Sequence, residues 1–110
     1  MGGKVKFRIW IEKQEGEPIL SLGKYLLLKE IEKTGSIKEA AKNLGYPYKK
    51  AHSYVKLIEK RLGKPIFVRK RGEGTVLTDA GRELLKKYEI LLQRFEELAR
   101  KLEGELFENL

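Results

Sequence analysis

The side chains best suited to binding chemistry in this sequence are cations at helical spacing. Lys49, Ser53, Lys56 and Lys60 follow one another at intervals of three or four residues, with Lys50 beside them. Ammonium groups bind phosphate oxygens, a lysine can also contact guanine, and a serine hydroxyl can bind a base edge. The run Arg69-Lys70-Arg71 supplies a second cationic group. Together these residues predict binding to double-stranded DNA.

The net charge of +8 is unevenly distributed along the 110 residues. Residues 36–72 hold eleven Lys and Arg against Glu39 and Glu59, which gives this segment a net charge of +9. Residues 1–35 carry +2, and residues 73–110 carry −3. A positive focus of this kind is typical of a nucleic-acid site, whereas a merely solvated surface is usually more even.

The composition argues against other kinds of site. Cysteine is absent, so disulfides and thiolate metal sites are excluded, and the single histidine, His52, cannot build a multi-histidine metal site. The sequence has no glycine-rich phosphate motif and no nucleophile paired with a base, so we expect no enzyme, no cofactor and no small-molecule site. Its longest aliphatic run, Leu26-Leu27-Leu28, is far short of a membrane span. We expect a cytoplasmic protein associated with the nucleoid.

Two helices about a glycine turn must position the lysines. Ser36 and Glu39 form an S-x-x-E capping box at the start of the first helix, and Gly45 permits the turn that follows. Pro47 suits the first position of the next helix, which ends before Gly63. The apolar residues of that helix share one face, opposite the lysines: Tyr48, Ala51, Val55, Ile58 and Leu62. The pattern predicts a helix-turn-helix over about 36–62.

A basic hairpin and a long helix follow. The hairpin spans about 65–78, with Arg69 to Arg71 at its bend, and the helix spans about 79–107, with Thr78 as its cap. The helix carries an apolar stripe made of Leu84, Tyr88, Leu91, Leu92, Phe95, Leu98 and Leu102. Such a stripe predicts a partner helix in a homodimer. The alternative is that it packs against the chain's own first helix, and one row of it can serve each purpose.

The first third of the chain predicts a strand, a turn, a short returning strand and a helix. Residues 5–11 alternate between apolar and polar, as in a strand with one buried face. Ser21 can cap a helix that runs to about Lys33. The whole chain is therefore predicted to be one α+β domain, mainly helical with a small β component. In order it holds an N-terminal strand, a helix-turn-helix, a hairpin wing and a long C-terminal helix.

Several short motifs carry a family resemblance. They are Gly35-Ser36-Ile37, Ala40-Ala41, Leu44-Gly45, Tyr48-Lys49-Lys50-Ala51, Leu62 to Arg69, and Val76 to Gly81. Through these motifs residues 36–81 resemble the DNA-binding domain of the LysR-type and ModE-type transcription regulators. The N-terminal strand and Tyr48-Lys49-x-Ala51 favour the ModE-like, molybdenum-regulator branch.

The resemblance implies a winged helix-turn-helix that binds DNA as a dimer. Its third helix would enter the major groove, and its wing would lie along the backbone or the minor groove. The residues implied to bind DNA are Ser36, Tyr46, Tyr48, Lys49, Lys50, Ser53, Lys56, Arg69, Lys70 and Arg71. His52 departs from the family pattern, since ModE-like proteins usually have Trp there. No oxyanion-binding domain follows the last helix, so the resemblance does not imply a response to molybdate.

Single residues have plainer interpretations. The lysines can form a solvated face, Tyr48 can belong to the core, and His52 can be a surface residue rather than a pH switch. Arg69 to Arg71 can protect an edge strand from aggregation. Two other functions remain open beside a sequence-specific regulator. One is an architectural protein of low specificity that coats DNA by charge, and the other is a protein–protein adaptor built on a winged-helix scaffold.

Overall fold

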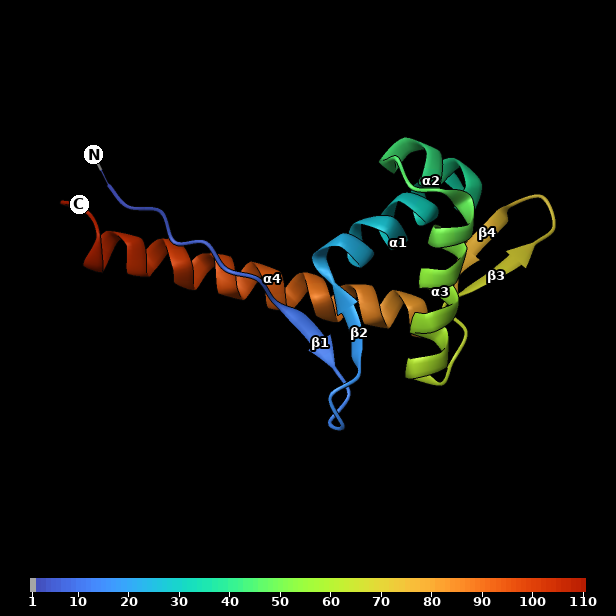
Figure 1. Cartoon of the computed structure of the whole chain (residues 1–110), viewed down its shortest axis with the longest axis horizontal. Helices are drawn as coiled ribbons and strands as arrows, with labels where there is room; N and C mark the ends of the chain where they lie inside the picture. Colours follow the sequence, from blue (N-terminus) through green and yellow to red (C-terminus); the bar gives the residue numbers. More distant parts are fainter. Residues whose placement is uncertain (1) are drawn as a thin grey trace.

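The computed structural model describes residues 2–110 as helices with two small hairpins (Figure 1). The elements are β1 (Trp10–Glu12), β2 (Pro18–Ser21), α1 (Leu22–Thr34), α2 (Ile37–Leu44), α3 (Tyr48–Leu62), β3 (Phe67–Lys70), β4 (Gly74–Leu77) and α4 (Asp79–Leu106). Both hairpins, β1–β2 and β3–β4, are antiparallel. The predicted winged helix-turn-helix architecture is confirmed.

The core lies where α1, α2, α3 and the first half of α4 meet. α1 contributes Leu27, Leu28 and Ile31, and α3 contributes Ala51, Val55 and Ile58. These side chains are removed from water because their three- and four-residue spacing places them on one side of each helix. On α2 the buried residues are the small Ala40 and Ala41, so α2 can approach both α1 and α3 closely.

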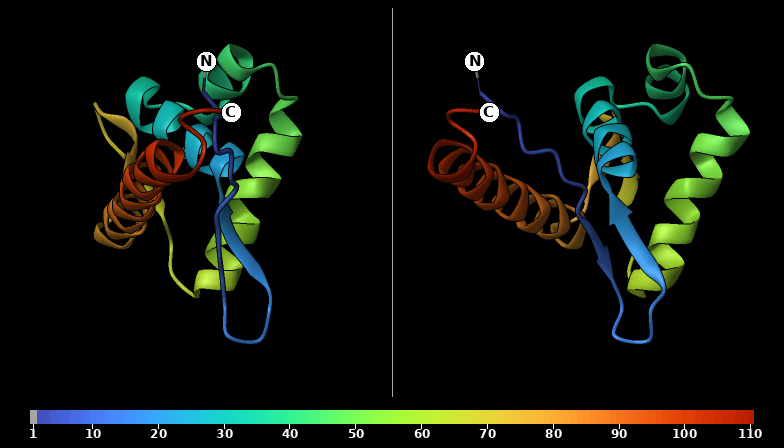
Figure 2. Two further views of the ribbon diagram at one scale, coloured as in Figure 1. Left: turned by 90° about the vertical axis from the view of Figure 1, so that its left-hand side faces the viewer. Right: turned by 60° about the vertical axis from the view of Figure 1, so that its left-hand side comes forward.

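The N-terminal strand is shorter than the alternation of residues 5–11 predicts. Only Trp10–Glu12 pairs with β2, and residues 2–9 run as an extended segment along α4 (Figure 2). The Val5 N–H donates to the Glu103 carboxylate (2.8 Å), and the Phe7 ring lies 6.1 Å from that of Phe95. The alternating apolar side chains of this segment therefore contact a helix, and the segment does not pair with another strand.

α4 begins in the core and then leaves the domain. The Gly81 N–H donates to the Thr78 hydroxyl (3.0 Å), which confirms the predicted cap. Leu84, Leu85 and Tyr88 are buried against the rest of the chain, while the helix continues well beyond the core and extends the molecule to 56 Å along its longest axis (Figure 1). The direction of α4 is therefore set by its first three turns.

A tyrosine pair fixes α4 against α1. The rings of Tyr25 and Tyr88 stack with centroids 5.0 Å apart, and the Tyr25 hydroxyl donates to the Glu89 carboxylate. Burial raises the pKa of Tyr25 above its usual range, and the hydrogen bond to Glu89 is the next largest cause of the increase. The Tyr88 hydroxyl donates to the Ile9 carbonyl (3.0 Å), so one residue connects α1, α4 and the N-terminal segment. Within residues 2–110, no helix is both long and apolar enough to cross a membrane.

Candidate nucleic-acid interface

The start of α2 and the turn between α2 and α3 are built largely as the sequence predicts. The Ser36 hydroxyl accepts from the Glu39 N–H (3.1 Å), and Gly45 ends α2 with a φ of +76°, which favours glycine. The capping box is only half formed, because the Ser36 N–H donates to the Thr34 hydroxyl instead of to Glu39. Pro47 precedes the helix as its N-cap, one position earlier than predicted, with an extended ψ of 141°.

The exposed face of α3 carries the predicted lysines. Lys49, Lys50, Ser53 and Lys56 are all exposed, and the buried residues of this helix lie on its other side. Lys56 is partly neutralised, since its ammonium lies 3.5 Å from the Glu59 carboxylate. The other three side chains of the group form no hydrogen bond or ion pair with the rest of residues 2–110. This surface therefore offers free donors and positive charge to a ligand.

The two tyrosines near the start of α3 differ in environment. Tyr46 is half-buried, and its ring meets that of Tyr54 edge to face at 6.0 Å. Tyr48 is 51% exposed and lies beside His52, with ring centroids 5.8 Å apart. The expectation of a core role for Tyr48 is wrong. Tyr48 lies in the first turn of α3, which projects beyond the core, and the buried residues of this helix begin at Ala51.

The wing is held against the helix-turn-helix by backbone contacts. The Thr75 N–H donates to the Gly35 carbonyl at the end of α1 (2.9 Å). Gly74 has a φ of +77°, and a β-carbon placed there would lie only 2.7 Å from the Gly35 oxygen. The strand can approach this closely only because Gly74 has no side chain. The position of the hairpin relative to α2 is thus fixed near its tip, where β4 begins.

The Glu59 carboxylate joins the other strand of the wing to α3. One of its oxygens accepts from the backbone N–H of Ile66 (2.8 Å) and of Phe67 (3.4 Å). Its side chain is only 14% exposed. Residue spacing does not indicate this role of Glu59, because the role depends on how closely α3 approaches the start of β3. Glu59 therefore supports the interface, and its side chain also lines the groove that separates α3 from the wing.

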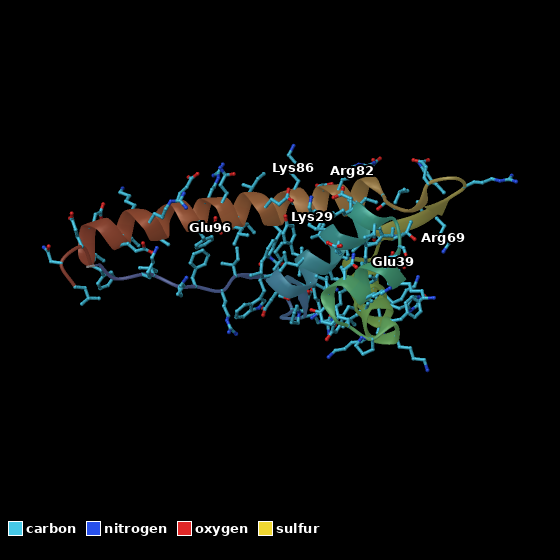
Figure 3. All side chains as sticks on the ribbon, turned by 90° about the horizontal axis from the view of Figure 1, so that it is seen from above. Lys29, Glu39, Arg69, Arg82, Lys86 and Glu96 are labelled. Atoms are coloured by element: carbon cyan, nitrogen blue, oxygen red, sulfur yellow. The ribbon has the colours of Figure 1, made fainter. Side chains whose placement is uncertain are left out.

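A groove of about 200 Å³ separates α3 from the wing, and Ile37, Tyr48, His52, Lys56, Arg69 and Thr75 are among the residues that line it. Arg69 is paired with Thr75 across the hairpin, so the two side chains share a face. Lys70 is paired with Gly74 and points to the other face, and Arg71 lies in the turn. All three cations are exposed, and Figure 3 shows Arg69 at the end of the molecule that holds α2 and α3.

His52 is one of the groove residues that lay outside the predicted set. Its four-residue spacing from both Tyr48 and Lys56 already placed it near their face, so the periodicity could have included it. An imidazole can donate to a phosphate or to a base edge. In residues 2–110 no group of three or more His, Asp or Glu side chains is arranged to hold a metal ion.

The apolar stripe on α4 divides into two parts. Leu84 and Tyr88 are buried in the core of their own chain, so their prediction as interface residues is wrong: neither can reach a partner. Leu92 and Leu102 are half-buried, whereas Leu91 (39%), Phe95 (45%) and Leu98 (48%) are exposed. The exposed three, with Leu102, lie at four- and three-residue spacing on the half of α4 that leaves the domain.

Comparisons with known proteins support a regulatory helix-turn-helix. Residues 22–82 match the family described as "Bacterial regulatory helix-turn-helix protein, lysR family". The chain is 42% identical over 77 residues to the transcriptional regulator ModE of Haemophilus influenzae (strain ATCC 51907 / DSM 11121 / KW20 / Rd). That alignment covers 66% of this chain and 30% of the relative, so the chain corresponds to less than a third of the relative's length.

Solved structures share the fold. A LysR family transcriptional regulator from Eggerthella lenta DSM 2243 superposes with a TM-score of 0.53 at 23% identity, covering 63% of this chain and 96% of that one. Another LysR family transcriptional regulator superposes with a TM-score of 0.61 at 20% identity, covering 74% of this chain and 30% of the other. At these identities the likeness concerns the arrangement of helices and strands.

Proposed function

Since this chain belongs to the lysR family of bacterial regulatory helix-turn-helix proteins, we propose that it regulates transcription by binding specific duplex sites through α3 and the β3–β4 wing. The family is one of DNA-binding transcription regulators rather than of enzymes. In this proposal α3 enters the major groove, and the wing contacts the adjacent backbone or minor groove. The protein would act in the cytoplasm, on the nucleoid.

The observation that carries the proposal is that two cationic surfaces, one on α3 and one on the wing, border the same groove. Lys49, Lys50 and Ser53 project from α3, and Arg69 projects from the wing across the groove that His52 and Lys56 line. Phosphates take most of the contacts in protein–DNA complexes, and cations along both walls of the groove suit a phosphate strand passing between them. Ser36 and Tyr46 lie at the two ends of α2, where their hydroxyls can add backbone contacts.

Base contacts would come from a small part of this surface. Lys49 or Lys56 can donate to guanine, Ser53 can donate or accept, and the exposed Tyr48 ring can touch a thymine methyl group. α3 contains no Asn or Gln, the side chains that pair best with adenine. We therefore expect a preference for guanine-containing half-sites, with a moderate penalty for substitutions at other positions.

We further propose that two copies pair through the outer half of α4. Leu91, Phe95, Leu98 and Leu102 would form the seam, with Leu92 at its border. Apolar residues at this spacing on a helix that leaves its own domain bury most surface against a second helix of the same kind. A two-fold dimer places its recognition helices about 34 Å apart and requires a palindromic site.

Selection of genomic fragments tests the proposal. The purified protein is mixed with sheared bacterial genomic DNA and excess random competitor, and the retained fragments are sequenced. We expect a palindromic motif enriched upstream of particular genes, with a preference of about 10³ or more over random DNA. Retention without a motif would support an architectural protein, the candidate that the absence of Asn and Gln on α3 favours. No retention at physiological salt would refute DNA binding itself.

A further inference from the structure

A second cationic cluster lies on the flank of α3 that faces away from the wing. Its centre is the ring of Tyr54, on α3. The Lys24 ammonium, from α1, lies 4.6 Å from the ring centroid, and the Lys50 ammonium lies 5.8 Å from it. Tyr46 meets the same ring edge to face. Three segments that are separate in sequence thus gather two cations about one aromatic ring.

The charge of this cluster is not neutralised within the described chain. Several other lysines have an ammonium group within 4.0 Å of a glutamate carboxylate: Lys13, Lys29, Lys56, Lys87 and Lys101. Among residues 2–110, Lys24 and Lys50 form no such pair, and the Tyr46 hydroxyl has no hydrogen-bond partner. A tyrosine ring holds an ammonium through its π electrons without cancelling the charge. The flank therefore keeps two full positive charges and a free hydroxyl.

The start of α1 adds to this positive potential. No acid occupies its first turn, and the Ser21 side chain makes no capping hydrogen bond. The N–H groups at a helix start carry partial positive charge, which an acid in the first turn would offset. Gly23, in the same turn, lies beneath the Tyr46 hydroxyl, which is 3.9 Å from the position of an added β-carbon. Lys24 follows directly.

The width of the major groove explains why such a flank is useful. The groove is about 12 Å wide, and an α-helix with its side chains is about 10–12 Å across. A helix lying in the groove therefore meets a sugar-phosphate backbone on each side. On α3, Tyr48, His52 and Lys56 line the groove toward the wing, whereas Tyr54, about 200° around the helix from His52, meets Lys24 of α1. The wing supplies cations to one backbone, and the other backbone would face the Tyr54 cluster.

We propose that Lys24, Lys50 and the Tyr46 hydroxyl form a second phosphate-backbone contact, on the side of α3 opposite the wing. The ligand is the phosphate strand of duplex DNA, and the inference rests on the function proposed above. Tyr54 is a positioning residue, since it touches the cations rather than the DNA. Lys24 is the new member of the interface, because neither helix-turn-helix nor wing contains it.

The test compares Lys24→Gln with Lys33→Gln, an exposed lysine at the other end of α1. Binding to a random-sequence duplex of about 30 base pairs is measured by fluorescence anisotropy at several salt concentrations. Loss of one phosphate contact should reduce the magnitude of the negative slope of log K against log[salt] by about 0.9 and weaken binding about fivefold near 0.15 M salt. Lys33→Gln should match the parent protein in both quantities.

Lys49→Gln separates failure of this inference from failure of the proposed function. If Lys49→Gln lowers the slope and Lys24→Gln does not, the second backbone contact is refuted while DNA binding through α3 stands. If neither changes the slope, the proposed function fails as well. Tyr54→Phe should bind like the parent protein because it keeps the ring, whereas Tyr54→Leu should lower the slope. An equal slope for both variants would refute the role of the ring.

Discussion

The carboxylate of Glu59 gives the sharpest test of how the wing is held. It accepts hydrogen bonds from the Ile66 and Phe67 N–H groups at 2.8 and 3.4 Å and pairs with Lys56 at 3.5 Å. Ile66 is fully buried, so its N–H has no access to water when the acceptor is removed. We expect the Glu59→Ala variant to leave this donor unpaired.

The magnitude follows from the loss of that acceptor. A hydrogen bond to a charged group contributes about 1.5–3 kcal/mol, and the weaker Phe67 bond adds little at its longer distance. The Lys56 partner is mostly exposed, so its pair contributes about 0.5 kcal/mol or less. Glu59→Ala should therefore lower the free energy of unfolding by about 2 kcal/mol and the melting temperature by about 10 °C. Glu59→Gln keeps an acceptor oxygen and should lose about half as much.

Urea unfolding followed by circular dichroism measures these losses, and Glu83→Ala is the matched control. Glu83 is an acid on a helix surface whose carboxylate lies 2.8 Å from the Lys87 ammonium, with both side chains about two-thirds exposed. Its removal should change stability very little, because solvent screens an exposed ion pair. Equal losses in Glu59→Ala and Glu83→Ala would contradict the connection between α3 and the wing.

The Glu59→Gln substitution should lower stability but should not lower DNA affinity. Glu59→Gln removes the negative charge beside Lys56, so that the lysine is free to contact phosphate. At a temperature where both proteins are folded, the variant should bind a random duplex as tightly as the parent protein or more tightly. Weaker binding with unchanged salt dependence would mean that the wing, rather than the charge of Lys56, controls affinity.

Three further outcomes can be measured with simple variants. Lys49→Ala should reduce the salt slope of DNA binding by about 0.9, and an unchanged slope would contradict the placement of the α3 face. Leu91→Glu should give monomers in analytical ultracentrifugation without loss of helicity, and a persisting dimer would refute the α4 seam. Gly74→Ala should destabilise the chain by about 2 kcal/mol more than Gly72→Ala in thermal unfolding. Both glycines have positive φ, but only Gly74 faces the Gly35 carbonyl, so equal losses would contradict that contact.

Local signals predicted the helix-turn-helix well because each boundary is fixed by nearby residues. Ser36 and Gly45 bound α2, and Gly63 ends α3, as the sequence indicated. Thr78 caps α4 for the same reason. The error of one residue at Pro47 concerns only whether the proline opens the helix or precedes it. These interactions are short in sequence, so their geometry follows from residue type.

Longer contacts could not be predicted in this way. Periodicity placed Leu84 and Tyr88 on one stripe with Leu91, but it cannot tell which part of a helix its own domain covers. The alternation of residues 5–11 suits a strand and also suits an extended segment on α4. The roles of Glu59 and Lys24 depend on distances between elements far apart in the chain. Sequence spacing contains no information about such approaches.

The division of α4 has a consequence for the DNA site. Tyr25 and Tyr88 fix the first half of α4 against α1, and the core fixes α1 against α3. The recognition helix and the free half of α4 are therefore parts of one rigid frame. In the proposed dimer, the distance between the two copies of α3 is set only by the register in which the two seams pair. Because one helical turn is about 5.4 Å, a shift of one turn along the seam would change the separation of the two half-sites. A seam formed by only Leu91, Phe95, Leu98 and Leu102 is short, so each of its side chains helps to exclude other registers, and half-site spacing should respond to substitutions there even when the dimer persists.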